Sequence, residues 1–328
     1  MLQSRRRKDR VTRRAKSTVD IVLPLYNEAD AFEETYGRIR AVVDALPQAF
    51  TFYCVDDGSS DGTAGLIRRL ARRDRRIHLI ELSRNFGHQA ALTAGLAAAR
   101  ADVVITMDGD GQHPPTLLPQ MLDLIEQGYD IVQGQRADSV NAGTLKRWTS
   151  VSFYQVLNFI SGTHVLPGAA DYRALSRQAA DALNAMPEYH RFLRGMISWM
   201  GYSSVILPYT EPKRIAGRSK YSLGKMIRLA MDAIFSFSLA PLFVGLSLGG
   251  ILLCLAAVEM AYVLSFWVTG RTSGLAPGWS SLMFVMLIIG GMLMLLLGFV
   301  GVYVGYIFQE VKRRPVFLAR KDTSSSHR

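Results

Sequence analysis

Short apolar runs rich in β-branched residues alternate with longer amphipathic stretches from Val19 to about Tyr209. Such a run between turn residues is typical of a buried strand, whereas apolar positions three or four residues apart are typical of a helix. The predicted strands cover residues 19–25, 51–56, 77–82, 102–107 and 130–134. The predicted helices cover residues 29–46, 62–73, 87–100 and 116–128. This alternation predicts an α/β domain with a mostly parallel sheet and helices on both faces.

The last third of the chain has a different pattern. Residues 239–266 contain Glu259 as their single formal charge, and residues 279–309 contain none. Each stretch exceeds the ~20 residues that span a bilayer core, so we predict two transmembrane helices; two buried core helices are the alternative. Basic residues precede the first stretch and follow the second, whereas the loop between them carries only Arg271. The positive-inside rule therefore predicts a multi-pass protein of the cytoplasmic (inner) membrane, with both termini and the α/β domain in the cytoplasm.

Two further segments have membrane-surface character. Apolar residues recur at helical spacing between Leu223 and Phe237, which predicts an amphipathic helix at the bilayer surface. The aromatic-rich stretch 148–160 is a second candidate, with a helix packed in the soluble core as the alternative. Basic residues dominate the first 16 positions and account for much of the net charge of +11. We expect this tail to be disordered and to contact anionic lipid rather than nucleic acid, because no base-reading module follows it.

The cysteine content points to a reducing compartment. Cys54 lies in an apolar strand-like run and Cys254 in a long apolar stretch. Their separation matches neither a metal site nor a disulfide framework.

The candidate chemistry begins with Asp108-Gly109-Asp110, which follows the predicted strand 102–107. In extended backbone, residues i and i+2 point to the same side, so both carboxylates are expected to face one site. Two carboxylates with open coordination positions suit Mg²⁺ or Mn²⁺ held jointly with a diphosphate. We expect Gly109 to leave room for a bulky ligand. The alternative is an ordinary acidic turn after a strand.

Polar groups also follow the first two predicted strands. Tyr26-Asn27-Glu28 ends the first, and Asp56-Asp57-Gly58 ends the second. Because ligands of such sheets bind at the carboxyl ends of the strands, these groups are expected beside the acidic pair, where they could stack on a base and bind a ribose. The alternative is turn chemistry, with Asn27 as a helix N-cap. Neither a G-x-G-x-x-G nor a Walker A sequence is present.

Taken together, the motifs resemble a known family. VLPLYNE, VDDGSSDGT, SRNFGHQAALTAG, MDGDGQHPP and KRIAGRSKYSLGKM occur in this order. They resemble the family 2 inverting glycosyltransferases, and more closely the branch that acts on polyprenyl phosphates, with the dolichol-phosphate mannose synthases and bactoprenol glucosyltransferases. The resemblance covers roughly residues 18–315 and implies a GT-A (Rossmann-like) domain that binds a nucleotide sugar.

The resemblance also implies the residues of the site. Those around the nucleotide sugar are Pro24, Tyr26, Glu28, Asp57, Asn85 and Asp108. Those around Mg²⁺ or Mn²⁺ are Asp108, Asp110 and Gln112, while His113 is not expected to be an independent ligand. The residues implied in catalysis are Asp110, Asp171 and Arg173. Those implied at the acceptor phosphate are Arg136, Arg147, Arg214, Ser219 and Lys220. Two departures from the family pattern are Gly111, which replaces the usual leucine, and Arg218, which stands where the branch often has glutamate.

The implied reaction is inverting transfer of a hexose, with UDP-glucose favoured, to polyprenyl phosphate, with undecaprenyl phosphate favoured. A phosphate monoester has a second pKa of about 6 and is largely ionised at neutral pH, so a strong general base is not required. We therefore expect Asp171 to orient the sugar or the acceptor. Base catalysis, or a purely structural pairing with Arg173, is the alternative. The identity of the sugar and the length of the acceptor chain stay open. The oligomeric state is open as well, since the two spans could associate with copies of themselves.

This interpretation divides the chain into five segments. They are a basic tail (1–17), a catalytic domain (18–212), a juxtamembrane acceptor-binding segment (213–238), two transmembrane helices (239–309) and a basic cytoplasmic tail (310–328). A processive polysaccharide synthase is one rival, but it needs more spans and a Gln-x-x-Arg-Trp segment, where this chain has HRFLRG at residues 190–195. A non-catalytic membrane scaffold that binds nucleotide sugars is the other.

Overall fold

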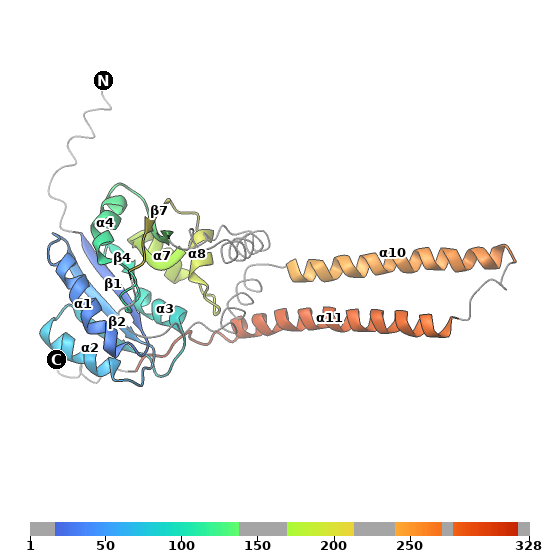
Figure 1. Ribbon diagram of the computed structural model, residues 1–328, viewed down its shortest axis with the longest axis horizontal. Helices are drawn as coiled ribbons and strands as arrows, with labels where there is room; N and C mark the ends of the chain where they lie inside the picture. Colours follow the sequence, from blue (N-terminus) through green and yellow to red (C-terminus); the bar gives the residue numbers. More distant parts are fainter. Residues whose placement is uncertain (1–16, 138–168, 213–239, 271–277, 321–328) are drawn as a thin grey trace, which may run out of the picture. The chain divides into compact units, whose positions relative to one another are not determined.

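The computed structural model describes residues 17–137, 169–212, 240–270 and 278–320 (Figure 1). The chain forms two compact units that interleave in sequence. The first, called the sheet unit here, comprises Met1–Val156, Thr163–Met226 and Pro315–Arg328. The second, the helical unit, comprises Leu157–Gly162 and Ile227–Arg314. Both predicted amphipathic helices, at residues 148–160 and 223–237, lie outside the described residues.

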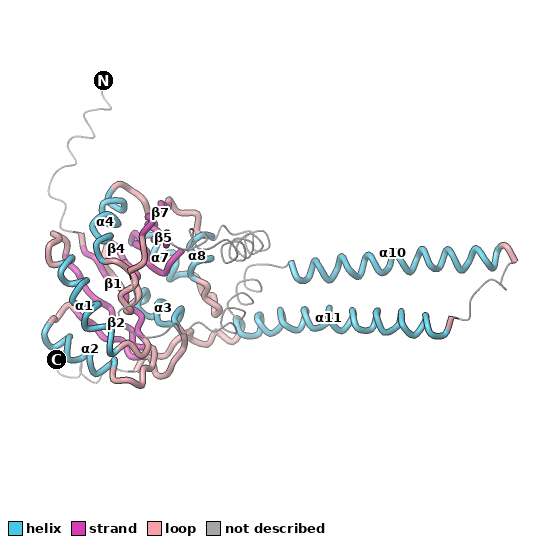
Figure 2. Tube along the Cα trace, in the orientation of Figure 1, coloured by secondary structure: helices cyan, strands magenta, loops and turns pink. Residues whose placement is uncertain are grey.

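A seven-stranded sheet with the order β3-β2-β1-β4-β6-β5-β7 forms the centre of the sheet unit (Figure 2). Its strands are β1 (Thr18–Leu25), β2 (Ala49–Asp56), β3 (Ile77–Glu81), β4 (Val103–Thr106), β5 (Ile131–Arg136), β6 (Ala169–Ser176) and β7 (Ser204–Tyr209). The first five occur where the apolar runs predicted them. The sequence did not predict β6 and β7 individually.

The pairing pattern confirms the predicted α/β class and shows where the sheet departs from a parallel one. β1 pairs in parallel with β2 and β4, β2 with β3, and β5 with β7. β6 runs antiparallel to both of its neighbours, β4 and β5. Since β2 and β4 lie on opposite sides of β1, the strand order reverses at β1, and a crevice for ligands is expected at its carboxyl end.

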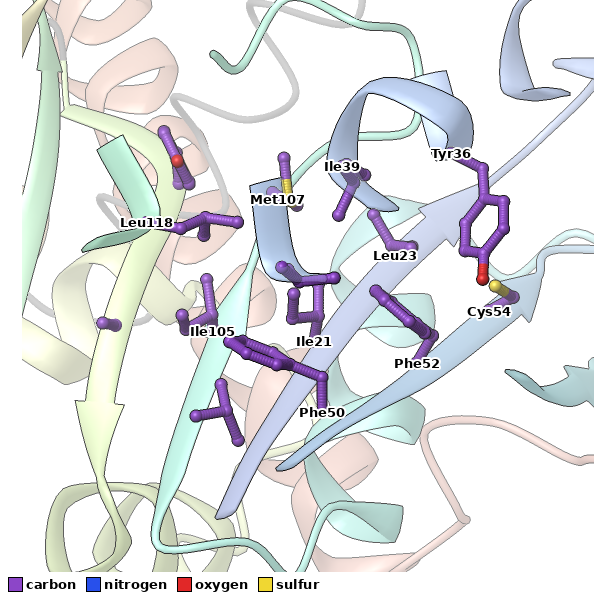
Figure 3. Close-up of a cluster of buried hydrophobic side chains, with 14 of the residues drawn as sticks. Ile21, Leu23, Tyr36, Ile39, Phe50, Phe52, Cys54, Ile105, Met107 and Leu118 are labelled. Atoms are coloured by element: carbon purple, nitrogen blue, oxygen red, sulfur yellow. The ribbon is translucent and has the colours of Figure 1, made fainter. Parts of the chain in front are cut away.

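Helices cover both faces of the sheet, as predicted. They are α1 (Ala29–Val43), α2 (Thr63–Arg73), α3 (His88–Ala98), α4 (Leu118–Glu126), α7 (Arg177–Ala185) and α8 (Leu193–Trp199), with a short 3₁₀ turn at Pro115–Leu117 before α4. In α1, Phe32, Tyr36 and Ile39 recur at helical spacing and are buried. They join Ile21 and Leu23 of β1 in the main hydrophobic cluster (Figure 3).

The opposite face of β1 packs against α3. Val22, between the two core residues of β1, is fully buried, and a Cβ added at Gly95 of α3 would lie 2.2 Å from its Cγ1. The glycine therefore lets α3 approach the strand closely. This contact fixes the position of α3, whose first residue, His88, belongs to the site described below.

Two long apolar helices, α10 (Ala240–Val268) and α11 (Trp279–Val311), belong to the helical unit. They pack together closely, since a Cβ at Gly245 would lie 2.0 Å from Leu296 Cδ2. Among the described residues, one stretch, Ile288–Val311, is long and apolar enough to cross a membrane by length and composition. Both apolar stretches are thus helical, and the prediction that they form two membrane spans stays a prediction.

The contact between α3 and β1 leads to a stability prediction. Gly95→Ala places a methyl group against buried Val22, and overpacking of this kind costs about 1–3 kcal/mol. Gly37→Ala is the matched control, because Gly37 lies inside α1 with nothing within 4 Å of its added Cβ. The control should gain up to about 1 kcal/mol from helix propensity. Thermal unfolding of the two full-length variants checks this, and a gain in stability for Gly95→Ala would contradict the packing argument.

Candidate active site

The antiparallel pairing of β4 with β6 determines which residues meet at the site. Thr106, the last residue of β4, pairs with Arg173 of β6, and its Oγ1 donates a hydrogen bond of 2.8 Å to the Asp171 carbonyl. Continuing this register brings Asp108 opposite Asp171. Residues that are remote in sequence therefore meet at one edge of the sheet because β6 is antiparallel to β4.

The carboxylate of Asp171 is the centre of a buried charged cluster. Its Oδ1 accepts a hydrogen bond of 2.6 Å from Arg173 Nη2, and its Oδ2 accepts one of 3.0 Å from Arg194 Nη2. His88 Nε2 lies 3.3 Å from the same Oδ2. Burial alone would raise the pKa of Asp171, but Arg194, His88 and Arg173 outweigh it and hold that pKa well below its usual range. Asp171 is consequently an ionised carboxylate and a weak base.

His88 links this cluster to the predicted metal loop. Its Nε2 also lies 3.6 Å from Asp108 Oδ1, so one imidazole contacts both carboxylates. Burial would lower the pKa of His88, but the hydrogen bond to Asp171 and the charge of Asp108 raise it. An acid from β6 and an acid from the loop after β4 are thereby connected through the first residue of α3.

His113 holds the loop that carries the acidic pair. Its Nδ1 accepts a hydrogen bond of 2.8 Å from the Asp108 backbone N–H, and its ring stacks on Tyr172 with the centroids 4.9 Å apart. Burial lowers the pKa of His113, which favours the neutral ring needed for that acceptor. Within the same loop, the Gln112 N–H donates to Asp110 Oδ1 over 3.1 Å. His113 is therefore used in shaping the loop.

The loop offers oxygen donors that fit a hard divalent cation. Asp108 Oδ1 is buried and accepts no hydrogen bond, although His88 Nε2 lies 3.6 Å from it, and a carboxylate oxygen of this kind is a suitable ligand for a hard cation. In the described part of the chain, no group of three or more His, Cys, Asp or Glu side chains is arranged as a metal site. A cation at Asp108 and Asp110 would thus need further ligands, such as the Gln112 amide and phosphate oxygens of a substrate.

Gly109 has a different use from the one expected. A Cβ at this position would lie 2.1 Å from Leu25 Cδ2 and 3.5 Å from Phe32 Cδ2, both of them core atoms. The position faces the junction of β1 and α1, so the absent side chain makes room for the core. The expectation that Gly109 leaves space for a ligand is wrong.

The loops after β1 and β2 are bound to each other. Asn27 has φ 53°, and its Oδ1 accepts a hydrogen bond of 2.8 Å from the Ser60 N–H. The N-cap of α1 is Glu28, and the Ala29 N–H at the helix start donates to Asp61 Oδ2 over 3.0 Å. The interpretation of Asn27 as the N-cap is therefore wrong. It holds the second loop instead, while Asp61 of that loop satisfies the start of α1.

Asp57 fastens a third loop. Its Oδ1 accepts from the Phe86 N–H over 2.7 Å and its Oδ2 from the Gly87 N–H over 2.9 Å. Burial raises the pKa of Asp57, and these two hydrogen bonds oppose the rise. The segment 83–87, called the donor loop below, carries Asn85 and ends immediately before His88. Asp57 thus fixes the loop on which another predicted nucleotide-site residue lies.

The remaining predicted residues fall into three groups. Pro24 lies in β1, while Tyr26, Glu28 and Asn85 lie in the loops at the carboxyl edge of the sheet. Arg136 ends β5, where its Nε donates to the Tyr209 hydroxyl over 3.4 Å and its Nη1 lies 3.5 Å from Glu211 Oε1. Outside the described residues lie Arg147, Arg214, Ser219 and Lys220.

Sequence reasoning missed two members of the site, His88 and Arg194. His88 is part of the motif SRNFGHQAALTAG, and Arg194 is part of HRFLRG, but neither has a spacing that points to chemistry. Their function depends on Asp171, whose position follows from the antiparallel register of β6. No local signal in the sequence could have shown that contact.

The fold and the site define a class of protein. A GT-A-like mixed α/β domain, with paired carboxylates after a central strand and beside the point where the strand order reverses, is the arrangement of a glycosyltransferase. The sequence matches the family described as "Glycosyl transferase family 2" over residues 20–183. The chain belongs to this family.

Relatives resemble it over nearly their whole length. It is 34% identical to the "Uncharacterized glycosyltransferase YkcC" of Bacillus subtilis (strain 168), over 92% of this chain and 93% of that one. It is 33% identical to the "SfII prophage-derived bactoprenol glucosyl transferase" of Shigella flexneri, over 94% of this chain and 98% of that one. Among solved structures, mannosyl-3-phosphoglycerate synthase from Rubrobacter xylanophilus has a TM-score of 0.49 and 19% identity, covering 66% of this chain and 72% of that one.

The buried cluster leads to a second stability prediction. Asp171→Asn leaves the guanidinium of Arg173, which is 2% exposed, without its negative partner. Breaking a buried pair in this way costs about 3–5 kcal/mol. Arg194→Gln should cost less, because Arg194 is partly exposed to solvent. Denaturation of the full-length protein compares them, and the double variant Asp171→Asn/Arg173→Met should recover part of the loss. Equal stability of Asp171→Asn and Arg194→Gln would contradict the pairing.

His88 should make stability depend on pH. Burial and the charge of Arg194 would lower its pKa, but Asp171 and Asp108 outweigh them and raise it in the folded state. The stabilisation is therefore complete below the unfolded value of about 6.5 and is lost as the pH rises through the folded value. In metal-free buffer, the difference in thermal midpoint between the wild type and His88→Gln should shrink from pH 6 upward. A difference that stays constant or grows would contradict the sign.

Proposed function

We propose that this protein transfers a hexose, with inversion, from a nucleotide diphosphate sugar to a polyprenyl phosphate. UDP-glucose and undecaprenyl phosphate are the expected substrates, and the product would be a polyprenyl-phosphate sugar for modification of an envelope glycan. The observation that carries the proposal is the near full-length similarity to a bactoprenol glucosyl transferase. That similarity extends through the apolar helices as well as the sheet unit. An acceptor with a lipid chain explains why an enzyme would need apolar helices in addition to a nucleotide-binding domain.

The donor would bind at the carboxyl ends of β1, β2 and β4. In this proposal its nucleotide lies against Pro24, Tyr26, Glu28, Asp57, Asn85 and Asp108. Asp108, Asp110 and Gln112 would hold Mg²⁺ or Mn²⁺ beside the diphosphate. When bound, the cation supplies positive charge that stabilises the departing diphosphate. Asp108 Oδ1 supports this assignment, because it is a buried carboxylate oxygen that accepts no hydrogen bond and has only the more distant His88 Nε2, at 3.6 Å, beside it.

Asp171 is proposed to orient the reactants and not to remove a proton. General bases work best with a pKa near the working pH, whereas the basic groups around Asp171 hold its pKa far below that. The attacking oxygen of a lipid phosphate is already ionised at neutral pH, since its second pKa is about 6. A fixed, ionised carboxylate can accept hydrogen bonds from sugar hydroxyls and hold Arg194 in place.

The acceptor would approach from the membrane side with its phosphate among basic side chains. Arg136, Arg147, Arg214, Ser219 and Lys220 are the proposed contacts. We propose that α10 and α11 are two membrane spans with both chain termini and the catalytic domain (residues 18–212) in the cytoplasm. Basic residues before the first span and after the second support this orientation.

The test is a transfer assay with the full-length protein in detergent. Undecaprenyl phosphate and Mg²⁺ or Mn²⁺ are supplied with radiolabelled UDP-glucose, UDP-galactose, UDP-N-acetylglucosamine or GDP-mannose in turn. Label should enter the lipid phase most rapidly from UDP-glucose, and EDTA should abolish transfer. Asp110→Asn should reduce the rate about 10²-fold or more, since it removes charge from the site that stabilises the leaving group.

Asp102→Asn is the matched control for this assay. Asp102 is also an acidic residue beside β4, but it lies at the opposite end of that strand and accepts a hydrogen bond from Thr18. The transfer rate of Asp102→Asn should stay near that of the wild type. If no donor labels the lipid while nucleotide binding is intact, the transferase proposal fails for this acceptor and a nucleotide-sugar-binding scaffold becomes the better explanation.

A further inference from the structure

The last described residues of the chain return to the sheet unit and pair with β3. Leu82 and Ala319 form an antiparallel bridge. The Ser83 N–H donates to the Leu318 carbonyl over 2.8 Å, and the Arg320 N–H donates to the Glu81 carbonyl over 2.7 Å. Because β3 is the first strand in the sheet order, its outer edge would otherwise present unpaired backbone groups at this point. The segment 318–320, called the C-terminal strand here, covers that edge.

The paired residue Ser83 is also the first residue of the donor loop. The other end of that loop is fixed by Asp57, which accepts hydrogen bonds from the Phe86 and Gly87 backbone N–H groups. In the middle, the loop lies against Gly58, where an added Cβ would be 2.6 Å from the Arg84 carbonyl carbon and 2.7 Å from the Asn85 nitrogen. The loop is thus held at its end and centre by Asp57 and Gly58, which follow β2, and at its start by the C-terminal strand, next to the hydrogen bond from the Leu82 N–H to the Asp56 carbonyl.

We infer that the C-terminal strand is a positioning element of the donor site. Its hydrogen bonds fix where the donor loop leaves β3, and this sets the position of Asn85 and of His88, the first residue of α3. Without the strand, the start of the loop loses the hydrogen bond of Ser83, so the hydrogen bonds from the Phe86 and Gly87 N–H groups to Asp57 should open more often. The inference rests on the proposed function in that the ligand of the loop is taken to be a nucleotide.

Pairing with β3 gives residues 318–320 a structural role that the basic composition of this segment does not suggest. Residues 310–328 are basic and were predicted to be a cytoplasmic tail. The part of that tail from Leu318 to Arg320 forms backbone hydrogen bonds, which depend on its extended conformation and not on its charge. The chain enters this strand shortly after α11 ends at Val311. One short segment of sequence therefore follows the apolar helix and contributes to the nucleotide site.

The experiment compares Arg320→Pro with Arg320→Ala in the full-length protein in detergent. Proline lacks the N–H that donates to Glu81, whereas alanine keeps it and removes only the side chain. Ala319→Pro is the second control, because it carries the same ring at a position from which no backbone hydrogen bond to β3 is made among the described residues. Hydrogen exchange of peptides covering residues 83–88 is measured without nucleotide, and the Kd for UDP with Mn²⁺ is measured separately.

In Arg320→Pro, exchange at Phe86 and Gly87 should accelerate about tenfold and the Kd for UDP should rise about tenfold, the size of one net hydrogen bond. Arg320→Ala and Ala319→Pro should stay close to the wild type in both measurements. Exchange in Arg320→Pro equal to that in Arg320→Ala would overturn the inference, as would faster exchange with an unchanged Kd. If the wild type itself does not bind UDP, the proposed nucleotide ligand fails, and the exchange result still decides whether the strand positions the loop.

Discussion

The carboxylate of Asp171 is buried between two arginines and a histidine, and the geometry of the site depends on its remaining ionised there. Moving such a charge out of water is unfavourable unless its partners are held in good geometry, so the cluster forms only when three parts of the fold are in register. β6 supplies Asp171 and Arg173, α8 supplies Arg194, and α3 supplies His88. The close approach of α3 to β1 at Gly95 and the antiparallel pairing of β6 with β4 are what allow those parts to meet. The environment of this one carboxylate therefore depends on the correct packing of α3 and α8 against the sheet and on the pairing of β6.

Much of the fold could be predicted from the sequence because its parallel half follows simple patterns. Buried parallel strands are short apolar runs, and the helices between them carry one apolar face, so β1 to β5 and α1 to α4 occur where those patterns predicted them. β6 was different. Its sequence AADYRALS contains an acidic and a basic residue in the strand interior, and their burial depends on pairing with each other and, for Asp171, with Arg194 and His88 as well. A polarity pattern assigns such residues to a surface. The charged residues of the site therefore prevented β6 from being predicted as a buried strand.

The candidate site was predicted only in part, because sequence patterns show residues that follow a strand but not contacts that strand pairing creates. Asp108 and Asp110 stand out because acidic residues directly after an apolar strand are visible in the sequence, and the family motifs point to them as well. His88 and Arg194 could not be found, since their contact with Asp171 is created by the register of β6 and not by sequence spacing. Gly109 was misinterpreted because a glycine beside a ligand site and a glycine above a core residue look alike in sequence, and only the direction of the missing Cβ separates them.

The interleaving of the two units has a practical consequence for work on this protein. A domain that precedes long apolar helices is commonly prepared by ending the expressed chain before the first of them, on the assumption that the domain is one continuous stretch. Here the sheet unit resumes at Pro315, after both α10 and α11. A shortened chain would lack the residues that cover the outer edge of β3 and would expose backbone groups that favour intermolecular strand pairing. Joining residues 315–320 to the shortened chain through a flexible linker would keep that edge covered in a fragment that lacks α10 and α11.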